Sequence, residues 1–318
     1  MQDQPHPPGR AGGLHETAEG AGPIPALVLA DRLDAGLYLV STPIGRARDI
    51  TLRALDVLNA AELLAAEDTR TLRHLMAIHG IPLRGRQILS YHDHNADRAR
   101  PAILAAITAG RSVAYCSDAG TPLVADPGFR LARDVAEAGG KVHAVPGASA
   151  LLAALTVAGQ PTDRFMFAGF APSQRGARRR WLKELTGIDA TVAIFESPRR
   201  VKELLKDLCE TDGERDISVC RELTKKFEEV MRGPARGLVD LIPAEGLRGE
   251  VVVVMGPPAA VVTGDAAVLD ALRARLDRMT MRDAVAEVAA ETGRPRKEVY
   301  RMALTMQEDG NADGHAMA

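Results

Sequence analysis

Four short segments of small and polar residues could bind a ligand, because each follows a stretch that predicts a buried strand. They are residues 42–45 (Thr-Pro-Ile-Gly), 67–70 (Glu-Asp-Thr-Arg), 117–122 (Ser-Asp-Ala-Gly-Thr-Pro) and 146–150 (Pro-Gly-Ala-Ser-Ala). In open α/β sheets, ligands bind at the carboxyl ends of the strands. Small residues there let a ligand approach the backbone, and Asp118 offers a carboxylate to a hydroxyl or ammonium group. For each segment taken alone, a tight turn capped by a polar side chain is the alternative.

A second group of residues is basic and could contact phosphate. Its members are arginines that lie close together in the sequence: Arg175, Arg178, Arg179, Arg180, Arg199 and Arg200. Guanidinium groups bind phosphate oxygens bidentately, so such a cluster suits a nucleic-acid backbone. The alternative is a solvated helix face, which needs no ligand.

Other common chemistries lack their signatures. No Gly-x-Gly-x-x-Gly follows the first predicted strand and no Gly-Lys-Ser/Thr loop occurs, which argues against nicotinamide and nucleoside-triphosphate cofactors. His92 and His94 could lie on one side of a strand end, but no third ligand is evident, so we expect no metal. Three widely spaced cysteines indicate buried thiols and not a disulfide scaffold.

The segments that must position these residues alternate between strand and helix. Strands are predicted at residues 37–41, 63–66, 87–91, 112–116 and 141–145, with apolar residues at helical spacing between them. This alternation predicts a mostly parallel sheet covered by helices on both faces. We place this α/β domain at residues 34–160, after a tail at 1–33.

The pattern changes beyond residue 160. Strands are predicted at 165–168, 191–195, 217–221, 228–231 and 250–255, with little helix between the last three. Strands without crossover helices pair antiparallel, so a second α/β domain at 161–258 should hold a mixed sheet. Residues 266–306 predict a small domain of three helices with a helix-turn-helix pattern. We expect residues 307–318 to form a tail.

Composition narrows the class of protein. The 318 residues are 46% hydrophobic and 26% charged, which is typical of a globular chain. A net charge of −2 argues against non-specific coating of nucleic acid, which needs a broadly basic surface. Because no apolar run is long enough for a membrane span and the N-terminus lacks a secretory signal, we expect a cytoplasmic protein.

Together the motifs resemble a known superfamily. The four loop segments, with residues 195–200 (Phe-Glu-Ser-Pro-Arg-Arg), 221–225 (Arg-Glu-Leu-Thr-Lys) and 249–250 (Gly-Glu), occur in order between residues 36 and 257. They resemble the tetrapyrrole methylases, and within them the ribosomal RNA small subunit methyltransferase I branch. The resemblance implies transfer of a methyl group from S-adenosylmethionine to the ribose 2′-hydroxyl of a cytidine in 16S rRNA. It also implies two α/β domains with the cofactor between them, and a homodimer.

The resemblance also assigns residues. Those that match the cofactor-binding motifs are Pro43, Asp118, Thr121, Ser149, Ala150 and Glu250. The candidates for a general base are Glu196, Glu222 and Lys225; a lysine acts as a base only when neutral, which requires burial. The arginine cluster is expected to contact the RNA.

Two other functions stay open at this point. One is methylation of a small tetrapyrrole-like molecule, which needs no arginine cluster. Residues 43–45 (Pro-Ile-Gly) depart from the Gly-rich loop of corrin-modifying relatives, which favours the RNA branch. The other is a non-catalytic RNA-binding or ribosome-assembly factor, which would bind no cofactor. The complete set of loop motifs argues against it.

Overall fold

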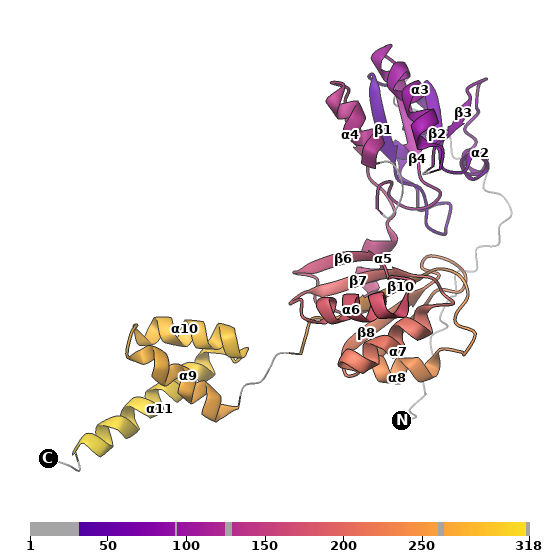
Figure 1. The fold of residues 1–318 in the computed structure, drawn as a ribbon. Coiled ribbons are helices and arrows are strands. Elements are labelled where there is room, and N and C mark those ends of the chain that lie inside the picture. Colours follow the sequence, from indigo (N-terminus) through magenta and orange to yellow (C-terminus); the bar gives the residue numbers. More distant parts are fainter. Residues whose placement is uncertain (1–31, 93, 125–128, 260–263, 316–318) are drawn as a thin grey trace, which may run out of the picture.

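A computed structural model describes residues 32–92, 94–124, 129–259 and 264–315, with only the backbone described for 307–315. The expected tail at 1–33 lies outside the described residues except for its last two. Figure 1 shows the two α/β domains and the C-terminal helices.

The first domain is built on a parallel sheet of five strands in the order β3-β2-β4-β1-β5. The strands are β1 (Gly36–Val40), β2 (Leu63–Ala66), β3 (Ile88–Ser90), β4 (Ser112–Cys116) and β5 (Val142–Val145). The helices are α1 (Leu52–Ala60), α2 (Thr69–Ile78), α3 (Ala96–Thr108) and α4 (Phe129–Glu137). The prediction of a mostly parallel sheet is confirmed.

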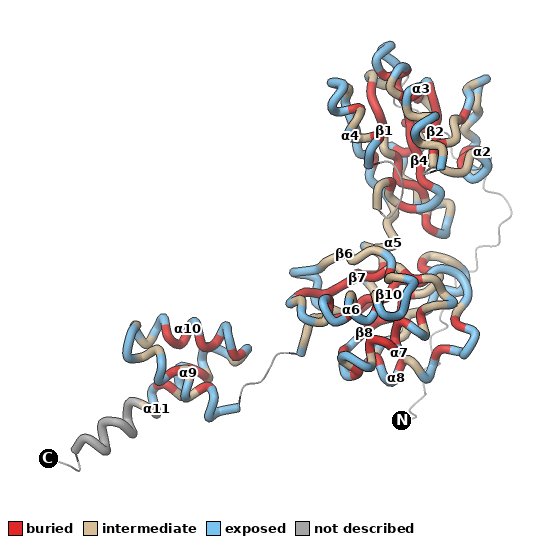
Figure 2. Tube along the Cα trace, in the orientation of Figure 1, coloured by how far each residue is buried: buried red, intermediate tan, exposed pale blue. Residues whose placement is uncertain are grey.

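Helices cover both faces of this sheet because its strands are apolar on both sides. Tyr38 and Val40 pack against α1 and α2 in one core cluster, whereas Leu37 packs against α3 and α4 in another. Successive strand residues point to opposite faces, which explains the division. Figure 2 shows the buried strands between more exposed helices. The buried sheet leaves the carboxyl ends of its strands as the place for a ligand.

The second domain holds a mixed sheet of five strands in the order β6-β7-β10-β8-β9, as predicted. The strands are β6 (Phe165–Phe170), β7 (Thr191–Glu196), β8 (Asp216–Arg221), β9 (Glu229–Pro234) and β10 (Val251–Met255). Only β6 and β7 pair in parallel; the other neighbours are antiparallel. The helices are α5 (Ala150–Ala158), α6 (Arg175–Thr186), α7 (Val201–Asp212) and α8 (Ala235–Leu241). The short α8 was not predicted.

The two faces of this mixed sheet have different covers. Helices α6, α7 and α8 cover one face and share a core with Val192 and Ile194 of β7. Helix α5 lies on the other face, where it packs against β8 and β10, although its residues fall within the range 34–160 that we assigned to the first domain. We call these the α6–α7 face and the α5 face. The α5 face lies on the side of the sheet nearer the first domain.

Three helices follow: α9 (Asp265–Leu276), α10 (Met281–Thr292) and α11 (Arg296–His315). They share a core that includes Leu272, Val288 and Val299. Helix α11 runs nine residues past Met306, so the tail expected from residue 307 is helical to 315. No proline interrupts this stretch, and the residues Gln-Glu-Asp at its start are compatible with a helix. No described helix is both long and apolar enough to span a membrane.

Candidate functional site

The carboxyl ends of β1 and β4 lie side by side at a topological switch point. The chain leaves β1 toward β2 on one side and leaves β4 toward β5 on the other. An isolated bridge pairs Thr42 with Gly120 just beyond the two strands, and the Thr42 hydroxyl donates to the Ser117 carbonyl at 3.2 Å. Switch points of this kind are where open α/β sheets bind their ligands.

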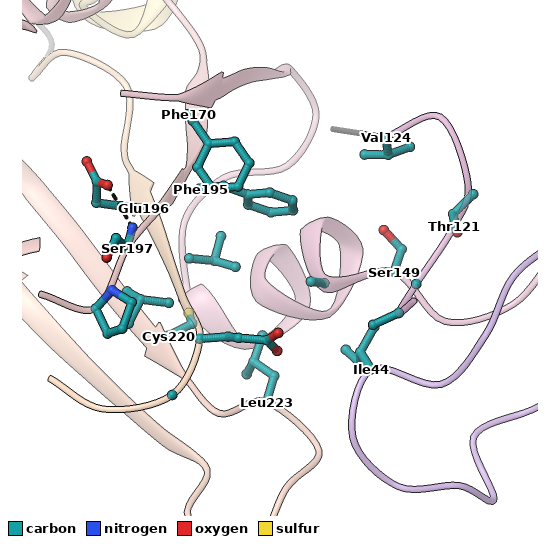
Figure 3. A pocket seen from close by; sticks show the side chains of 18 residues that line it. Ile44, Thr121, Val124, Ser149, Phe170, Phe195, Glu196, Ser197, Cys220 and Leu223 are labelled. Atoms are coloured by element: carbon teal, nitrogen blue, oxygen red, sulfur yellow. Dashed lines mark hydrogen bonds between the residues drawn. The ribbon is translucent and has the colours of Figure 1, made fainter. Parts of the chain in front are cut away.

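A cavity of about 350 Å³ begins at this point and lies between the two α/β domains (Figure 3). The first domain and the start of α5 contribute Ile44, Ala119, Gly120, Thr121, Val124, Ser149 and Ala150. The second domain contributes residues from the ends of β6, β7, β8 and β10 and the loops beside them: Phe170, Phe195, Glu196, Ser197, Pro198, Cys220, Leu223, Gly249, Glu250, Val251 and Val252. Its volume is in the range of small-molecule and cofactor sites.

Of the residues assigned to the cofactor, the structure brings four into this lining: Thr121, Ser149, Ala150 and Glu250. Thr121 also joins loops, since its hydroxyl donates to the Ala148 carbonyl at 3.0 Å and accepts from Ser41 at 3.1 Å.

Pro43 and Asp118 lie outside the lining, although their neighbours Ile44 and Ala119 belong to it. The Asp118 carboxylate accepts a hydrogen bond from the Asp68 backbone N–H at 2.9 Å. Asp118 therefore ties the second predicted loop to the third, beside the cavity.

The apolar residues that the second domain contributes to the cavity lining were not predicted from the sequence. Phe170, Phe195 and Val252 line the cavity from three strands of the second sheet. Phe195 and Val252 lie on the α5 face of the sheet. The strand assignment alone does not say that this face borders the cavity. Once α5 is placed on the sheet, the period-2 alternation of β7 and β10 identifies Phe195 and Val252.

The chemistry of the lining fits S-adenosylmethionine. Ser149 precedes α5 without forming a side-chain cap, so the first backbone N–H groups of the helix remain free at the cavity. A helix N-terminus carries partial positive charge and suits a carboxylate. Ile44, Leu223 and Val252 supply apolar walls, while Gly120 and Ala150 leave room beside the backbone. These are the features that an amino-acid group and an adenosine group require.

An ion-pair triad lies at the second-domain side of the cavity. The Lys225 ammonium is 2.8 Å from a Glu222 carboxylate oxygen and 2.9 Å from one of Glu250. Burial lowers the pKa of Lys225, but hydrogen bonds to and charges of the two glutamates outweigh it, so this pKa is raised. The hydrogen bond from Lys225 lowers the pKa of Glu222. Lys225 therefore favours its protonated form, which argues against it among the candidate bases, because a lysine acts as a base only when neutral.

The loop that carries the triad is strained and interlocked with the first domain. Glu222 and Thr224 adopt φ of +51° and +65°, which side-chain-bearing residues seldom do. A Cβ on Gly45 would lie 2.4 Å from the Thr224 hydroxyl oxygen, so only glycine fits there. The Arg46 guanidinium also donates to the Thr224 carbonyl at 3.1 Å. Strain of this kind is concentrated at ligand clamps and active sites.

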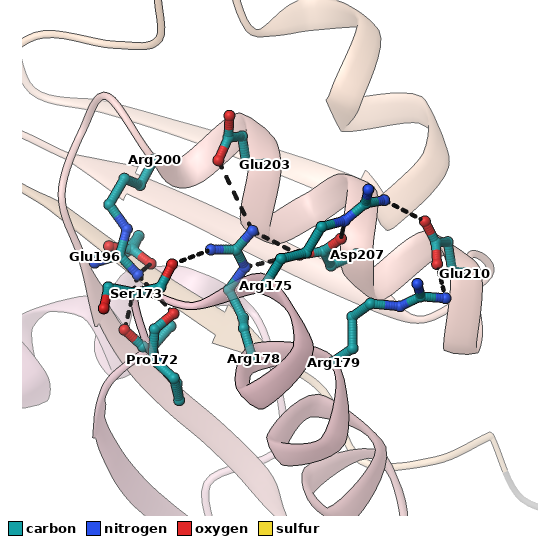
Figure 4. A network of polar contacts seen from close by, with 11 residues as sticks. Pro172, Ser173, Arg175, Arg178, Arg179, Glu196, Arg200, Glu203, Asp207 and Glu210 are labelled. Carbon is teal, nitrogen blue, oxygen red and sulfur yellow. Dashed lines mark hydrogen bonds and ion pairs between the residues drawn. The ribbon is translucent and has the colours of Figure 1, made fainter.

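Glu196, the third candidate base, has its carboxylate on the wrong face. It follows Val192 and Ile194 in the alternation of β7, so its side chain lies on the α6–α7 face, 3.2 Å from Arg200 (Figures 3 and 4). Burial raises its pKa, although the Ser197 N–H and nearby arginines act in the opposite direction. Glu196 is among the residues that line the cavity, but its side chain is only 1% exposed and its carboxylate is held by Arg200 and the Ser197 N–H, which argues against it as the base.

The arginine cluster divides into internal and exposed members (Figure 4). Arg178 shares the inward face of α6 with Leu182 and Leu185, and its side chain is only 4% exposed. Its guanidinium is 2.6 Å from the Asp207 carboxylate of α7, which is equally buried. The expectation that Arg178 contacts RNA is therefore wrong for this structure: the residue joins α6 to α7.

The other arginines differ in whether their guanidinium groups already bind another group of the protein. Arg175 pairs with Asp207 at 2.9 Å, Arg179 pairs with Glu210, and Arg200 donates to the carbonyls of residues 171 and 172. Arg180 and Arg199 are exposed, and no acidic partner is found for either in the part of the chain that the structure describes. These two keep their guanidinium groups available for phosphate.

The cysteines lie where thiols are unreactive. Burial raises the pKa of Cys116 to about 12 and that of Cys220 to about 11. Within the described ranges, no three His, Cys, Asp or Glu side chains are grouped as a metal site would need. His92 and His94 pack ring against ring at 6.0 Å.

Comparisons with known proteins agree with this geometry. Residues 36–239 match the family model of Tetrapyrrole (Corrin/Porphyrin) Methylases, and residues 262–307 match that of the RsmI C-terminal HTH domain. Two solved structures have the same fold. A cobalt precorrin-4 methyltransferase matches with a TM-score of 0.54 and 20% identity, over 69% of this chain and 94% of that one. A diphthine synthase matches with a TM-score of 0.56 and 17% identity, over 69% of this chain and 89% of that one. At such low identity these likenesses show the fold alone.

Whole-chain relatives are more informative. A ribosomal RNA small subunit methyltransferase I from Mesorhizobium japonicum is 45% identical over 89% of this chain and 96% of its own length. Proteins of the same name from Micromonospora olivasterospora and Bacillus subtilis are 39% and 35% identical, over 90% and 83% of this chain and 92% of their own lengths. The expected superfamily, branch and cofactor class are confirmed, against both alternatives. This chain belongs to the ribosomal RNA small subunit methyltransferase I family of S-adenosylmethionine-dependent tetrapyrrole methylases.

Proposed function

We propose that this chain methylates the ribose 2′-hydroxyl of a cytidine in 16S rRNA, within the small ribosomal subunit. The observation that carries the proposal is the convergence of family motifs from both α/β domains on one cavity of about 350 Å³. The strained loop around Glu222 and the loop around Gly45 close on each other beside that cavity. Such an arrangement holds a cofactor and an acceptor in fixed relative positions, which is the main requirement of methyl transfer.

The cofactor site is the half of the cavity formed by Thr121, Ser149 and Ala150, with Glu250 opposite. When bound, S-adenosylmethionine supplies an electrophilic methyl group on a sulfonium centre. The free N–H groups at the start of α5 would hold its carboxylate. Ile44, Leu223 and Val252 supply apolar surface beside it.

The ion-pair triad performs the proton transfer. Glu250 is 72% exposed at the cavity and has its carboxylate fixed by Lys225, so it can accept the proton of an incoming ribose hydroxyl. The Lys225 ammonium stabilises negative charge that develops on the ribose oxygen as the oxygen–carbon bond forms. Glu222 is a positioning residue that holds Lys225 through a 2.8 Å contact.

Arg180 and Arg199 contact RNA phosphates in this proposal. Both are exposed. Arg180 lies on α6, and Arg199 lies in the turn before α7, the helix that packs against α6. Phosphate contacts fix the orientation of the nucleic acid and carry no sequence information. The target nucleotide must then be selected by the cavity. We expect the enzyme to act in the cytoplasm, where its proposed substrate is assembled.

A homodimer is part of the proposal. Helix α5 consists almost wholly of apolar residues, yet Leu152 on it is 54% exposed. A second copy of the chain would cover this surface. Light scattering at micromolar concentration would give twice the chain mass of 33.9 kDa for a dimer.

Methyl transfer to isolated small subunits tests the function. Unmodified subunits are incubated with methyl-labelled S-adenosylmethionine, and the rRNA is hydrolysed with alkali. A 2′-O-methylated cytidine survives as an alkali-resistant dinucleotide, because the methyl group blocks the hydroxyl that cleavage needs. Label on a base, or no label with well-folded protein and bound cofactor, would contradict the proposal.

A further inference from the structure

Aromatic rings are scarce in this chain, and two of them, Phe170 and Phe195, line the cavity. Only 3% of residues are aromatic, with six phenylalanines in all. Three of the six form one cluster in the second domain. The Phe195 ring lies 4.7 Å from that of Phe167 and 5.7 Å from that of Phe170, with interplanar angles of 64° and 72°. Phe170 and Phe195 line the cavity.

A β-bulge aims Phe170 at the cavity. Phe167 pairs with Ala193 and Phe170 pairs with Phe195, so three steps along β6 match two along β7. Gly169, within the bulge, has φ of +74°, which glycine adopts without strain. In a regular ladder Gly169 would oppose Phe195, and Phe170 would point to the α6–α7 face. The extra residue turns Phe170 to the α5 face, and bulges beside active sites commonly re-aim a side chain in this way.

Phe170 is also unusually open for so large an apolar side chain. It is 59% exposed, although it lines a cavity and contacts Phe195. Figure 3 shows Phe170 across the cavity from Ile44 and Ser149, on the opposite side from the proposed cofactor half. The exposed ring therefore remains available to a second ligand beside the cofactor.

We propose that Phe170 is the stacking platform for the cytosine ring of the target nucleotide. This inference rests on the proposed function. A ribose within reach of Glu250 must belong to a nucleotide turned out of its stack, because an enzyme cannot reach a stacked nucleotide inside a cavity. An unstacked base is commonly held on an aromatic side chain. The bulge and the Phe195 contact fix the ring that replaces the lost stacking.

The test compares variants at Phe170 with one at Phe165, an exposed phenylalanine at the other end of β6 that lies outside the cavity lining. We expect Phe170→Ala and Phe170→Leu to lower kcat/KM on small subunits about tenfold, since each loses the ring. Phe170→Tyr keeps a ring and should retain activity. Phe165→Ala should match wild type, and cofactor affinity by calorimetry should be unchanged in all four.

Three results would overturn the inference. Phe170→Ala with wild-type kcat/KM would show that no stacking occurs there. Phe170→Leu as active as wild type would show that the side chain provides only apolar cover. A large loss of cofactor affinity in Phe170→Ala would assign the ring to the adenine of the cofactor. Failure of the proposed function is distinguishable from these, because wild-type protein would then fail to methylate the subunit.

Discussion

The two faces of the mixed sheet in the second domain both carry charged residues, but they use them differently. On the α6–α7 face, Arg178 and Asp207 are buried together, with side chains 4% and 2% exposed. On the α5 face, Lys225 and Glu250 lie at an open cavity, 29% and 72% exposed. The first pair has no room for a ligand, whereas the second keeps hydrogen-bonding capacity for one.

The difference follows from what each face packs against. Three helices cover the α6–α7 face, so an arginine on the inward side of α6 must pair with a buried acid. The α5 face is covered by one short helix, and the space beside it opens toward the first domain. We therefore expect substitutions on the α6–α7 face to change stability, and substitutions on the α5 face to change activity.

The largest expected effect on activity is at Glu250. Glu250→Gln removes the proposed proton acceptor and should lower kcat by about 10²–10⁴-fold. The melting temperature should hardly change, because the side chain is largely exposed. Glu245→Gln, at another exposed position nearby in the sequence, is the matched control. A Glu250→Gln enzyme with wild-type kcat would place the proton acceptor elsewhere.

The largest expected effect on stability is at Asp207. Asp207→Asn leaves the buried Arg178 charge without its counter-ion and should lower the free energy of unfolding by about 3–5 kcal/mol in denaturant titrations. Glu203→Gln is the control: this glutamate is 68% exposed and 3.8 Å from Arg178, so little stability should be lost. Equal losses in the two variants would refute the internal role of the pair.

A smaller effect is expected from the exposed arginines. Replacing Arg180 and Arg199 together by alanine should raise KM for small subunits several-fold and make KM less sensitive to salt, because two phosphate contacts are lost. Stability should stay the same. Arg179→Ala, whose guanidinium pairs with Glu210, should have less effect on KM. An unchanged salt dependence in the double variant would exclude these arginines from the RNA contact.

The smallest effect concerns pH. The pKa of Glu222 is lowered below its ordinary value of 4.5, mainly by the Lys225 hydrogen bond. Ionised Glu222 therefore stabilises the fold above pH 4.5, and this contribution is lost as pH falls from 4.5 through the lowered pKa. The melting temperatures of wild type and Glu222→Gln should thus converge in acid. A difference that stays constant from pH 7 to pH 3 would contradict this assignment.

The sequence predicted both sheets and the loops at the strand ends, because continuous apolar runs and small polar turns are local signals. Features that depend on residues distant in the sequence could not be predicted. The spacing of Arg178 with Leu182 and Leu185 was visible, but its partner Asp207 lies 29 residues away on another helix. Of the two glutamates that raise the pKa of Lys225, Glu222 is three residues away but Glu250 lies 25 residues further on. The role of Phe170 depends on a one-residue shift in strand register.

The central claim is that the cavity on the α5 face binds the cofactor, and calorimetric titration of S-adenosylmethionine tests it most directly. Ala150→Leu adds bulk inside the cavity at the start of α5, and Thr156→Leu places the same side chain on an exposed position of the same helix. We predict at least a tenfold loss of affinity in Ala150→Leu, because three added carbon atoms occupy space that the cofactor needs, and wild-type affinity in Thr156→Leu. Wild-type affinity in both variants would place the cofactor outside this cavity and contradict the account.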